Sequence, residues 1–260
     1  MTTWLEAVIL GIVQGLTEFL PVSSSGHLEI AKYLLGDDSL GEQGLLMTIT
    51  LHAATALATL VVYRSDVAEI IRGTLKNQEA ERSYTLKIIL SMIPAVMAGL
   101  LLESQIEGLF NQNMTLISMM LIVTGLLLLL SEWLGTGLKR IGFSEAFIIG
   151  IAQAIAIIPG ISRSGATISA ALLLGGDKTK SARFSFLMVI PLIFGKMIKE
   201  LLDGDFSSES VDLMPLAIGF AVAFFAGWIA CKWIIAIVKH SKLKYFSVYC
   251  FIVAALLWVI

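Results

Sequence analysis

The chain has 260 residues, of which 57% are hydrophobic and 15% carry a charge. Soluble domains contain about 45–50% apolar and about 25% charged residues, so the composition excludes an ordinary soluble enzyme and a disordered chain and indicates a polytopic helical membrane protein. The net charge of −2 provides no basic field for nucleic acid, so we expect membrane lipids around the protein and no nucleic acid as a partner.

The first predicted element, Leu5–Leu35, is apolar at both ends and polar in its centre. Gln14 and Glu18 interrupt it, and the run Pro21–His27 (PVSSSGH) follows. Next come three apolar stretches close to the roughly 20 residues that a membrane span needs: Leu45–Tyr63, Tyr84–Leu102 and Met114–Trp133.

A second stretch with a polar centre, Ala146–Leu174, lies in the other half of the chain. It is interrupted by Gln153 and by the run Pro159–Gly165 (PGISRSG). Three further apolar stretches complete the chain: Phe184–Leu202, Val211–Val238 and Tyr245–Ile260. The sequence therefore predicts an all-α fold with six transmembrane helices.

The two stretches with polar centres are predicted to be re-entrant helical hairpins. Polar groups in the centre of a lipid-facing helix are costly, and non-helical backbone at membrane depth occurs only where protein or water surrounds it. Each stretch is expected to enter the membrane, turn at its Ser/Gly-rich break and leave on the same side. The alternative is one continuous spanning helix with a polar centre. With hairpins and an outer N-terminus, most lysines and arginines fall in inner segments, as the positive-inside rule requires.

The two halves of the chain match at a constant offset of 139 positions, without a gap. Gln14 falls on Gln153, and Ser23–Gly26 (SSSG) falls on Ser162–Gly165 (SRSG). Chance coincidence of small residues is the alternative to a true repeat. We predict one integral membrane domain, residues 1–260, that contains an inverted-topology repeat of residues 1–134 and 140–260, with one hairpin and three spans in each half. The breaks of the two hairpins are expected to meet near the membrane midplane.

The halves differ at three positions that the offset brings together: Glu18 with Ile157, Ser24 with Arg163, and His27 with Ala166. The first half thus supplies an acid, a hydroxyl and an imidazole, and the second supplies a guanidinium. These differences predict one asymmetric site instead of two equal ones.

The Ser/Gly breaks predict a phosphate site. A helix that begins after such a break directs free backbone N–H groups toward an anion, and arginine binds phosphate through two hydrogen bonds. The residues expected to hold the anion are Arg163, Ser23, Ser25, Ser162, Ser164 and Gln14. Two structural alternatives remain. Arg163 and Glu18 form a buried ion pair that joins the halves, or His27 is a hydrogen-bonded core residue.

Two segments carry a resemblance to a known family. QGLTEFLPVSSSGHL (Gln14–Leu28) and PGISRSGATIS (Pro159–Ser169) resemble the motifs of the undecaprenyl-diphosphatase family of the bacitracin-resistance type, as do MIPAV (Met92–Val96) and FSFL (Phe184–Leu187). The resemblance implies an integral membrane phosphatase of the bacterial plasma membrane. Such an enzyme converts a polyprenyl diphosphate lipid, undecaprenyl diphosphate, to undecaprenyl phosphate and so recycles the lipid carrier of peptidoglycan synthesis. A homodimer is left open as its assembly.

The resemblance also implies roles for individual residues. Ser24 and His27 match the serine and histidine held to be catalytic, and Arg163 matches the phosphate-binding arginine. Glu18 matches the second acid of the family's [E/Q]xxxE motif, whereas Gln14 stands where many members carry the first. With that acid missing, Mg²⁺ or Ca²⁺, which the family is thought to use, is expected to be held by Glu18 and the diphosphate itself.

The mechanism implied by these roles begins with attack of Ser24 on the terminal phosphorus, with His27 as base, and ends with release of phosphate by water. Glu18 would orient His27 or bind the cation. Attack by His27 or by water directly is left open. The alternative function is a transporter or flippase of a polyprenyl phosphate, because broken helices in inverted repeats are typical of secondary transporters. The N-terminus and the mouth of the site are predicted on the outer, periplasmic side.

Overall fold

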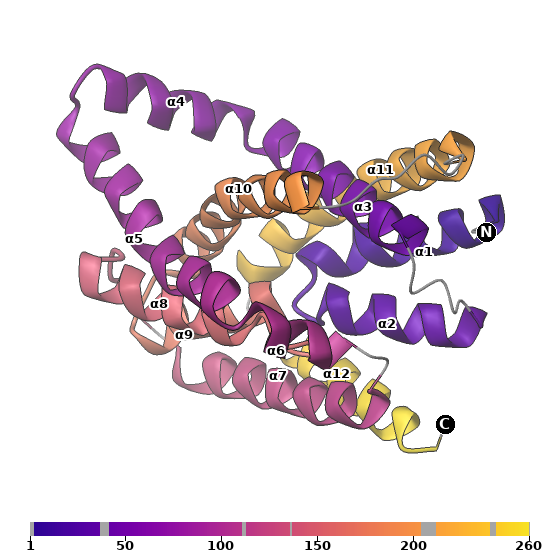
Figure 1. The fold of residues 1–260 in the computed structure, drawn as a ribbon. Helices are drawn as coiled ribbons and strands as arrows, with labels where there is room; N and C mark the ends of the chain where they lie inside the picture. The colour runs from indigo at the N-terminus through magenta and orange to yellow at the C-terminus, as the bar shows by residue number, and fades with distance from the viewer. Residues whose placement is uncertain are drawn as a thin grey trace.

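The protein is helical over nearly all of the chain that can be described (Figure 1). The computed structural model describes residues 3–36, 42–110, 113–135, 137–203, 212–239 and 243–259. Within these ranges, strand-type pairing is limited to an isolated bridge between Lys139 and Gly176. The fold class predicted from the composition is confirmed, and the chain is an all-α polytopic membrane protein.

Among the described residues, five helices are long and apolar enough to cross a membrane. They are α3 (Glu42–Val62), α5 (Glu79–Leu101), α7 (Met114–Leu134), α10 (Lys178–Asp203) and α11 (Leu213–Lys239). Each coincides with a predicted span. The sixth predicted span corresponds to α12 (Leu243–Leu257), which is apolar but has only 15 residues. Because those residues extend about 22 Å, α12 is shorter than a hydrocarbon core of about 30 Å.

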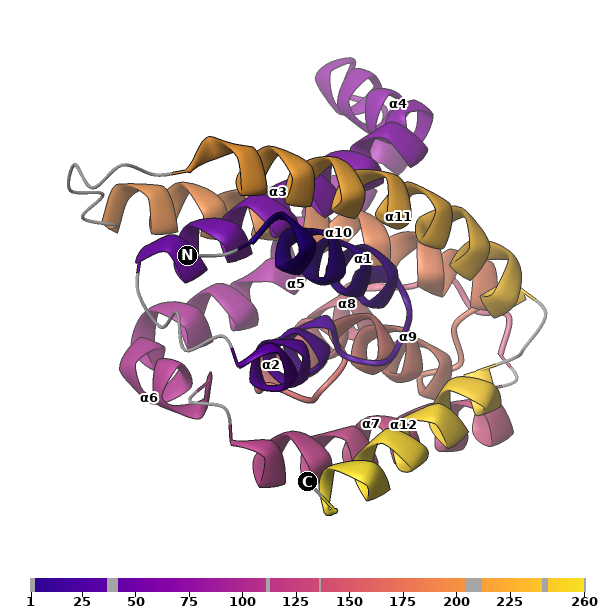
Figure 2. The same ribbon diagram turned by 90° about the vertical axis from the view of Figure 1, so that its right-hand side faces the viewer.

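One longer helix lies outside every predicted element. α4 (Arg64–Leu75) occupies part of a segment that the sequence indicated only as an inner loop. It packs against α5 and projects from the other helices (Figures 1 and 2). A short α6 (Glu103–Glu107) and a 3₁₀ turn η1 (Gly108–Phe110) follow α5. A search for long apolar runs misses α4 because charged residues interrupt its apolar positions.

Both stretches with polar centres form helical hairpins. α1 (Trp4–Phe19) and α2 (Ser24–Leu35) make the first, and α8 (Phe143–Ile155) and α9 (Arg163–Leu173) make the second. With 11 to 16 residues each, these helices extend about 17–24 Å, less than the hydrocarbon core. The alternative of one continuous spanning helix is wrong for both stretches, because each chain turns at the predicted Ser/Gly break.

Matched residues begin matched helices in the two hairpins. Ser23 and Ser162 are the N-caps of α2 and α9, and each Oγ accepts a hydrogen bond from the backbone N–H three residues on, at 3.2 and 3.0 Å. Glu6 and Glu145, also related by the offset, each accept a hydrogen bond from the N-cap N–H of the first helix of their hairpin. The repeated letters of the sequence therefore encode repeated helix starts.

Each hairpin packs against a span of the other half of the chain. α1 lies along α11, where a Cβ placed on Gly15 would come within 2.6 Å of the Cβ of Ala226. α8 lies along α5, where a Cβ on Gly150 would come within 2.4 Å of the carbonyl oxygen of Ser91. Small residues allow such close helix contacts in membranes. α7 and α12, the last predicted spans of the halves, also lie side by side (Figure 2). This exchange of partners fits the repeat, whose boundaries stay a prediction.

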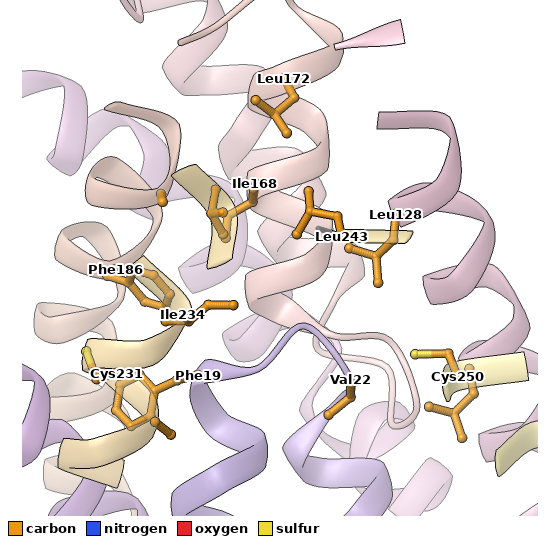
Figure 3. Close-up of a cluster of buried hydrophobic side chains, with 14 of the residues drawn as sticks. Phe19, Val22, Leu128, Ile168, Leu172, Phe186, Cys231, Ile234, Leu243 and Cys250 are labelled. Carbon is orange, nitrogen blue, oxygen red and sulfur yellow. The ribbon is translucent and has the colours of Figure 1, made fainter. Parts of the chain in front are cut away.

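The largest apolar core joins both hairpins to the spans (Figure 3). Phe19 and Val22 come from the first hairpin, Ile168 from the second, and Phe186 and Ile234 from α10 and α11, and none of these is more than 2% exposed. Helix association within lipid depends on close packing more than on a hydrophobic driving force. This core therefore fixes the two turns relative to each other.

Candidate active site

The turns of the two hairpins touch. A Cβ placed on Gly26 would lie 3.1 Å from the Cα of Gly160, and one placed on Gly165 would lie 3.4 Å from the Cβ of Pro21. Glycine at position 26 is thus explained by the closeness of the opposite turn, whereas a Cβ on Gly165 would first meet the Cβ of Ser162 in its own turn, at 3.0 Å. As the sequence predicted, the breaks of the hairpins meet, and the N-termini of α2 and α9 begin beside that meeting point.

A buried carboxylate lies at the centre of this contact. Glu18 Oε1 is 2.5 Å from an Nη atom of Arg163, so the ion pair joins α1 to α9. Ser24 Oγ donates to Glu18 Oε2 at 2.7 Å, and Gln14 Nε2 donates to the same oxygen at 3.0 Å. The Glu18 side chain is 7% exposed and that of Arg163 is 16% exposed. The structure therefore brings Gln14, Glu18, Ser24 and Arg163 together, and it confirms the ion-pair geometry without excluding a role in binding.

Two polar atoms of this cluster are buried and lack a partner among the described residues. They are Nη1 of Arg163 and Oε1 of Gln14. A guanidinium carries five N–H donors, and Glu18 accepts from Nη2 of this one. An unpaired buried donor costs about 1–3 kcal/mol. An anion oxygen beside Arg163 would remove that cost, which makes the arginine suitable for a phosphate group.

Backbone donors point to the same chemistry. α2 and α9 begin at Ser24 and Arg163, which are matched positions of the repeat. In the part of the chain that the structure describes, the N–H groups of these two residues and of Ser25 and Ser164 have no hydrogen-bond partner. Two helix N-termini with free N–H groups and partial positive charge thus lie close together, an arrangement that binds anions.

The other predicted serines mainly hold the turns. Ser23 and Ser162 are both 2% exposed and cap their helices, and their Oγ atoms lie 3.4 and 3.3 Å from those of Ser25 and Ser164. Ser164 Oγ also donates to the carbonyl of Leu20, in the opposite turn, at 3.3 Å. Their predicted contacts with a diphosphate stay a prediction. The geometry shows hydroxyls already used by the fold, whereas Ser24 directs its hydroxyl to Glu18.

His27 was expected to be the base for Ser24, but its side chain makes other contacts. Its Nδ1 lies 2.7 Å from the carbonyl oxygen of Ser23, and its Nε2 lies 2.9 Å from the hydroxyl of Tyr249 on α12. No hydrogen bond joins His27 to Ser24 or Glu18 within the described ranges. The group that accepts the Ser24 proton in this arrangement is therefore Glu18. The sequence did not indicate this, because one helical turn separates Ser24 from His27 and either rotamer fits that spacing.

Two supporting hydroxyls were missed by the motifs. Thr124 Oγ1 of α7 accepts a hydrogen bond from the N–H of Ser162 and donates to the carbonyl of Gly160, both at 3.0 Å. Thr55 of α3 lies 3.5 Å from Gln14 Nε2. Each lies in an apolar span that contains other Ser or Thr residues, so the sequence offered no signal that singled them out.

The donor set around Glu18 does not fit a divalent cation held by the protein. Mg²⁺ and Ca²⁺ require several oxygen ligands, but the neighbours of this carboxylate are a guanidinium, an amide NH₂ and a donating hydroxyl. No group of three or more His, Cys, Asp or Glu side chains is close enough to hold a metal ion among the residues that the structure describes. The chemistry of this site is suited to an anion.

Comparison of the sequence with known proteins identifies its family. The family model described as bacitracin resistance protein BacA matches residues 7–256. The chain belongs to this family. It is 57% identical over 249 residues to an undecaprenyl-diphosphatase of Christiangramia forsetii, covering 95% of this chain and 94% of that protein. Identity is 46% over 253 residues to the undecaprenyl-diphosphatase of Parabacteroides distasonis (95% and 94% covered) and 41% over 251 residues to that of Methanococcus vannielii (95% and 96% covered).

Proposed function

We propose that this member of the BacA family is an undecaprenyl-diphosphate phosphatase. It hydrolyses the diphosphate to undecaprenyl phosphate and phosphate, which returns the lipid carrier to cell-wall synthesis and confers bacitracin resistance. The observation that carries the proposal is the contact of a Ser24–Glu18 pair with Arg163 and two helix N-termini at the meeting point of the hairpins. The names of the relatives support it.

The diphosphate is bound by donors that the fold leaves free. Its oxygens accept from Nη1 of Arg163 and from the N–H groups at the starts of α2 and α9. Donors held in place before the reaction also stabilise the charge that develops on the transferred phosphoryl group. As Arg163 turns toward the substrate, Glu18 loses part of its pairing and becomes available as a proton acceptor.

The proposed reaction has two displacements at phosphorus. Ser24 Oγ attacks the terminal phosphorus and passes its proton to Glu18, which already accepts its hydrogen bond at 2.7 Å. The bond from phosphorus to the bridging oxygen breaks, and undecaprenyl phosphate leaves. Water then attacks the phosphoserine, the bond from phosphorus to Ser24 Oγ breaks, and Oγ takes its proton back from Glu18. Phosphate departs with the protons of the attacking water. No step is assigned to a divalent cation, and Mg²⁺ or Ca²⁺ is proposed to accompany the diphosphate, whose oxygens are the harder ligands.

The proposed location is the bacterial plasma membrane, with the N-terminus and the opening of the site on the outer side. The positive-inside rule supports this orientation, because α4 and the residues after it are rich in arginine and lysine and lie one span away from the first hairpin. The isoprenoid tail would leave the site sideways between helices.

The test is phosphate release from undecaprenyl diphosphate by the purified protein in detergent. We expect turnover in the wild type and a loss of at least 100-fold, about 2.7 kcal/mol at 1.36 kcal/mol per tenfold, in Ser24→Ala and Arg163→Ala. Exposed residues of the same types provide the controls Ser104→Ala and Arg72→Ala, which should retain activity. Acid quench followed by mass spectrometry should locate phosphate on Ser24.

Two outcomes would contradict the proposal. Near-normal turnover in Ser24→Ala would exclude the serine as nucleophile and leave attack by water or by His27. No phosphate release from a folded wild type that still binds the lipid diphosphate would overturn the hydrolase assignment and favour a polyprenyl-phosphate transporter.

A further inference from the structure

The imidazole of His27 is held between two elements that are distant in sequence. Its Nδ1 lies 2.7 Å from the carbonyl oxygen of Ser23, at the turn of the first hairpin, and its Nε2 lies 2.9 Å from the hydroxyl of Tyr249, on α12. The two rings are stacked, with centroids 5.6 Å apart and planes inclined by 13°. Both nitrogens are therefore occupied, and the ring has one defined orientation.

The chemistry of the two partners determines the tautomer. A carbonyl oxygen can only accept, so Nδ1 must carry the proton that bonds to Ser23. In the neutral ring Nε2 then has a lone pair, and it accepts a hydrogen bond from the hydroxyl of Tyr249. The basic nitrogen of His27 thus points at α12 and away from the Glu18–Ser24 pair.

α12 is anchored independently of this contact. Ser247 Oγ donates to the carbonyl of Gly125 on α7 at 2.7 Å, and Ser118 Oγ of α7 donates to the carbonyl of Ala254 at 2.9 Å. These bonds lie on both sides of Tyr249 along the helix. Since Tyr249 is itself 41% exposed, its hydroxyl is not needed to hold α12 in the bundle. The contact therefore fixes His27 and not the fold.

We infer that Tyr249 is a positioning residue of the phosphatase site, which sets the tautomer and direction of His27 from outside both hairpins. This inference rests on the proposed function. It makes α12 part of the active centre and separates two tasks: Glu18 accepts the proton of Ser24, and His27, held by Tyr249, binds the carbonyl of Ser23, the residue that precedes the nucleophile. Loss of a hydrogen bond of this kind lowers a rate about tenfold.

The kinetic test uses Tyr249→Phe, which keeps the stacked ring and removes only the hydroxyl. We expect kcat to fall about tenfold with KM unchanged, and an unchanged midpoint of thermal unfolding. The matched control is Tyr245→Phe, one turn earlier on the same helix and 62% exposed, which should behave as the wild type. In a His27→Gln background, Tyr249→Phe should cause no further loss, because its effect passes through the imidazole.

The second test needs no activity. In ¹⁵N-histidine-labelled protein, the chain's three histidines give few signals, and His27→Gln assigns the relevant one. We expect the Nδ1–H tautomer in the wild type. In Tyr249→Phe, the ¹⁵N chemical shift of Nε2 should move to the value of a nitrogen whose lone pair accepts no hydrogen bond. An Nε2–H tautomer in the wild type would overturn the inference, as would an undiminished loss in the His27→Gln background. A wild type that releases no phosphate but shows the expected tautomer would contradict the proposed function alone.

Discussion

The ion pair between Glu18 and Arg163 allows a prediction in which stability and activity separate. Removing one partner of a buried pair leaves an uncompensated charge and costs about 3–5 kcal/mol, whereas replacing both by neutral groups of similar size is often nearly neutral. The side chains here are only 7% and 16% exposed. We therefore expect Glu18→Gln and Arg163→Met each to be destabilised by about 3–5 kcal/mol, and the double variant to recover most of that loss.

The assay is thermal unfolding in one detergent, followed by tryptophan fluorescence. At about 2–4 °C per kcal/mol, each single variant should unfold roughly 6–20 °C below the wild type. Arg183→Met is the matched control, because Arg183 also lies 2.5 Å from a carboxylate, that of Asp66, but is 40% exposed. A pair so accessible to solvent contributes about 0–1 kcal/mol.

Two results would refute this reasoning. Equal shifts of the unfolding midpoint for Arg163→Met and Arg183→Met would mean that burial does not raise the cost of removing one partner of an ion pair. Additive losses in the double variant would mean that Glu18 and Arg163 are not coupled. All three variants at the inner pair should lose phosphatase activity whatever their stability, because each removes a charge that the proposed reaction uses.

Three further predictions concern the turns, the packing and the metal. Ser23 has a φ of +73°, so Ser23→Gly should relieve about 1–2 kcal/mol of strain and lose only a few tenths of a kcal/mol with the cap. Ser162 has a φ of −74°, so Ser162→Gly should only lose stability. Equal midpoints of thermal unfolding for the two variants would contradict this. Gly15→Ala should cost about 1–3 kcal/mol by forcing α1 from α11, whereas Gly99→Ala, with open space around it, should be neutral or stabilising in the same assay. Calorimetry on the lipid-free protein should find Mg²⁺ and Ca²⁺ binding no tighter than about 10⁻³ M, and a micromolar site would contradict the anion-type donor set.

Much of the fold could be predicted from the sequence because its determinants are local. A Ser/Gly break in an apolar stretch ends one helix and caps the next, so the hairpins and the starts of α2 and α9 follow from a few letters. The repeat then places the two turns together. The presence of α4 was not predicted, because charged residues interrupt its apolar positions.

The details of the site depend on side-chain directions, which spacing does not determine. Ser24 reaches Glu18 and His27 turns to Tyr249, although the residues Ser24 and His27 lie on one helical turn. Ser23 has a positive φ and its carbonyl accepts from the imidazole, and nothing in a run of three serines signals that conformation. Tyr249 lies 222 positions from His27 in the chain, outside both long motifs. Contacts of this kind follow from packing of the whole bundle.

The asymmetry of the repeat explains how one site arises from two similar halves. Ser24 and Arg163 are the first residues of matched helices, and both reach the same carboxylate, Glu18, whose own counterpart is the apolar Ile157. Two arginines at these positions would bind an anion but offer no nucleophile, and two serines would lack the fixed positive charge that holds a phosphate. A second carboxylate at position 157 would repel the substrate. Divergence of the halves at these positions thus turns a symmetric anion cradle into a site with a nucleophile on one side and a cation on the other.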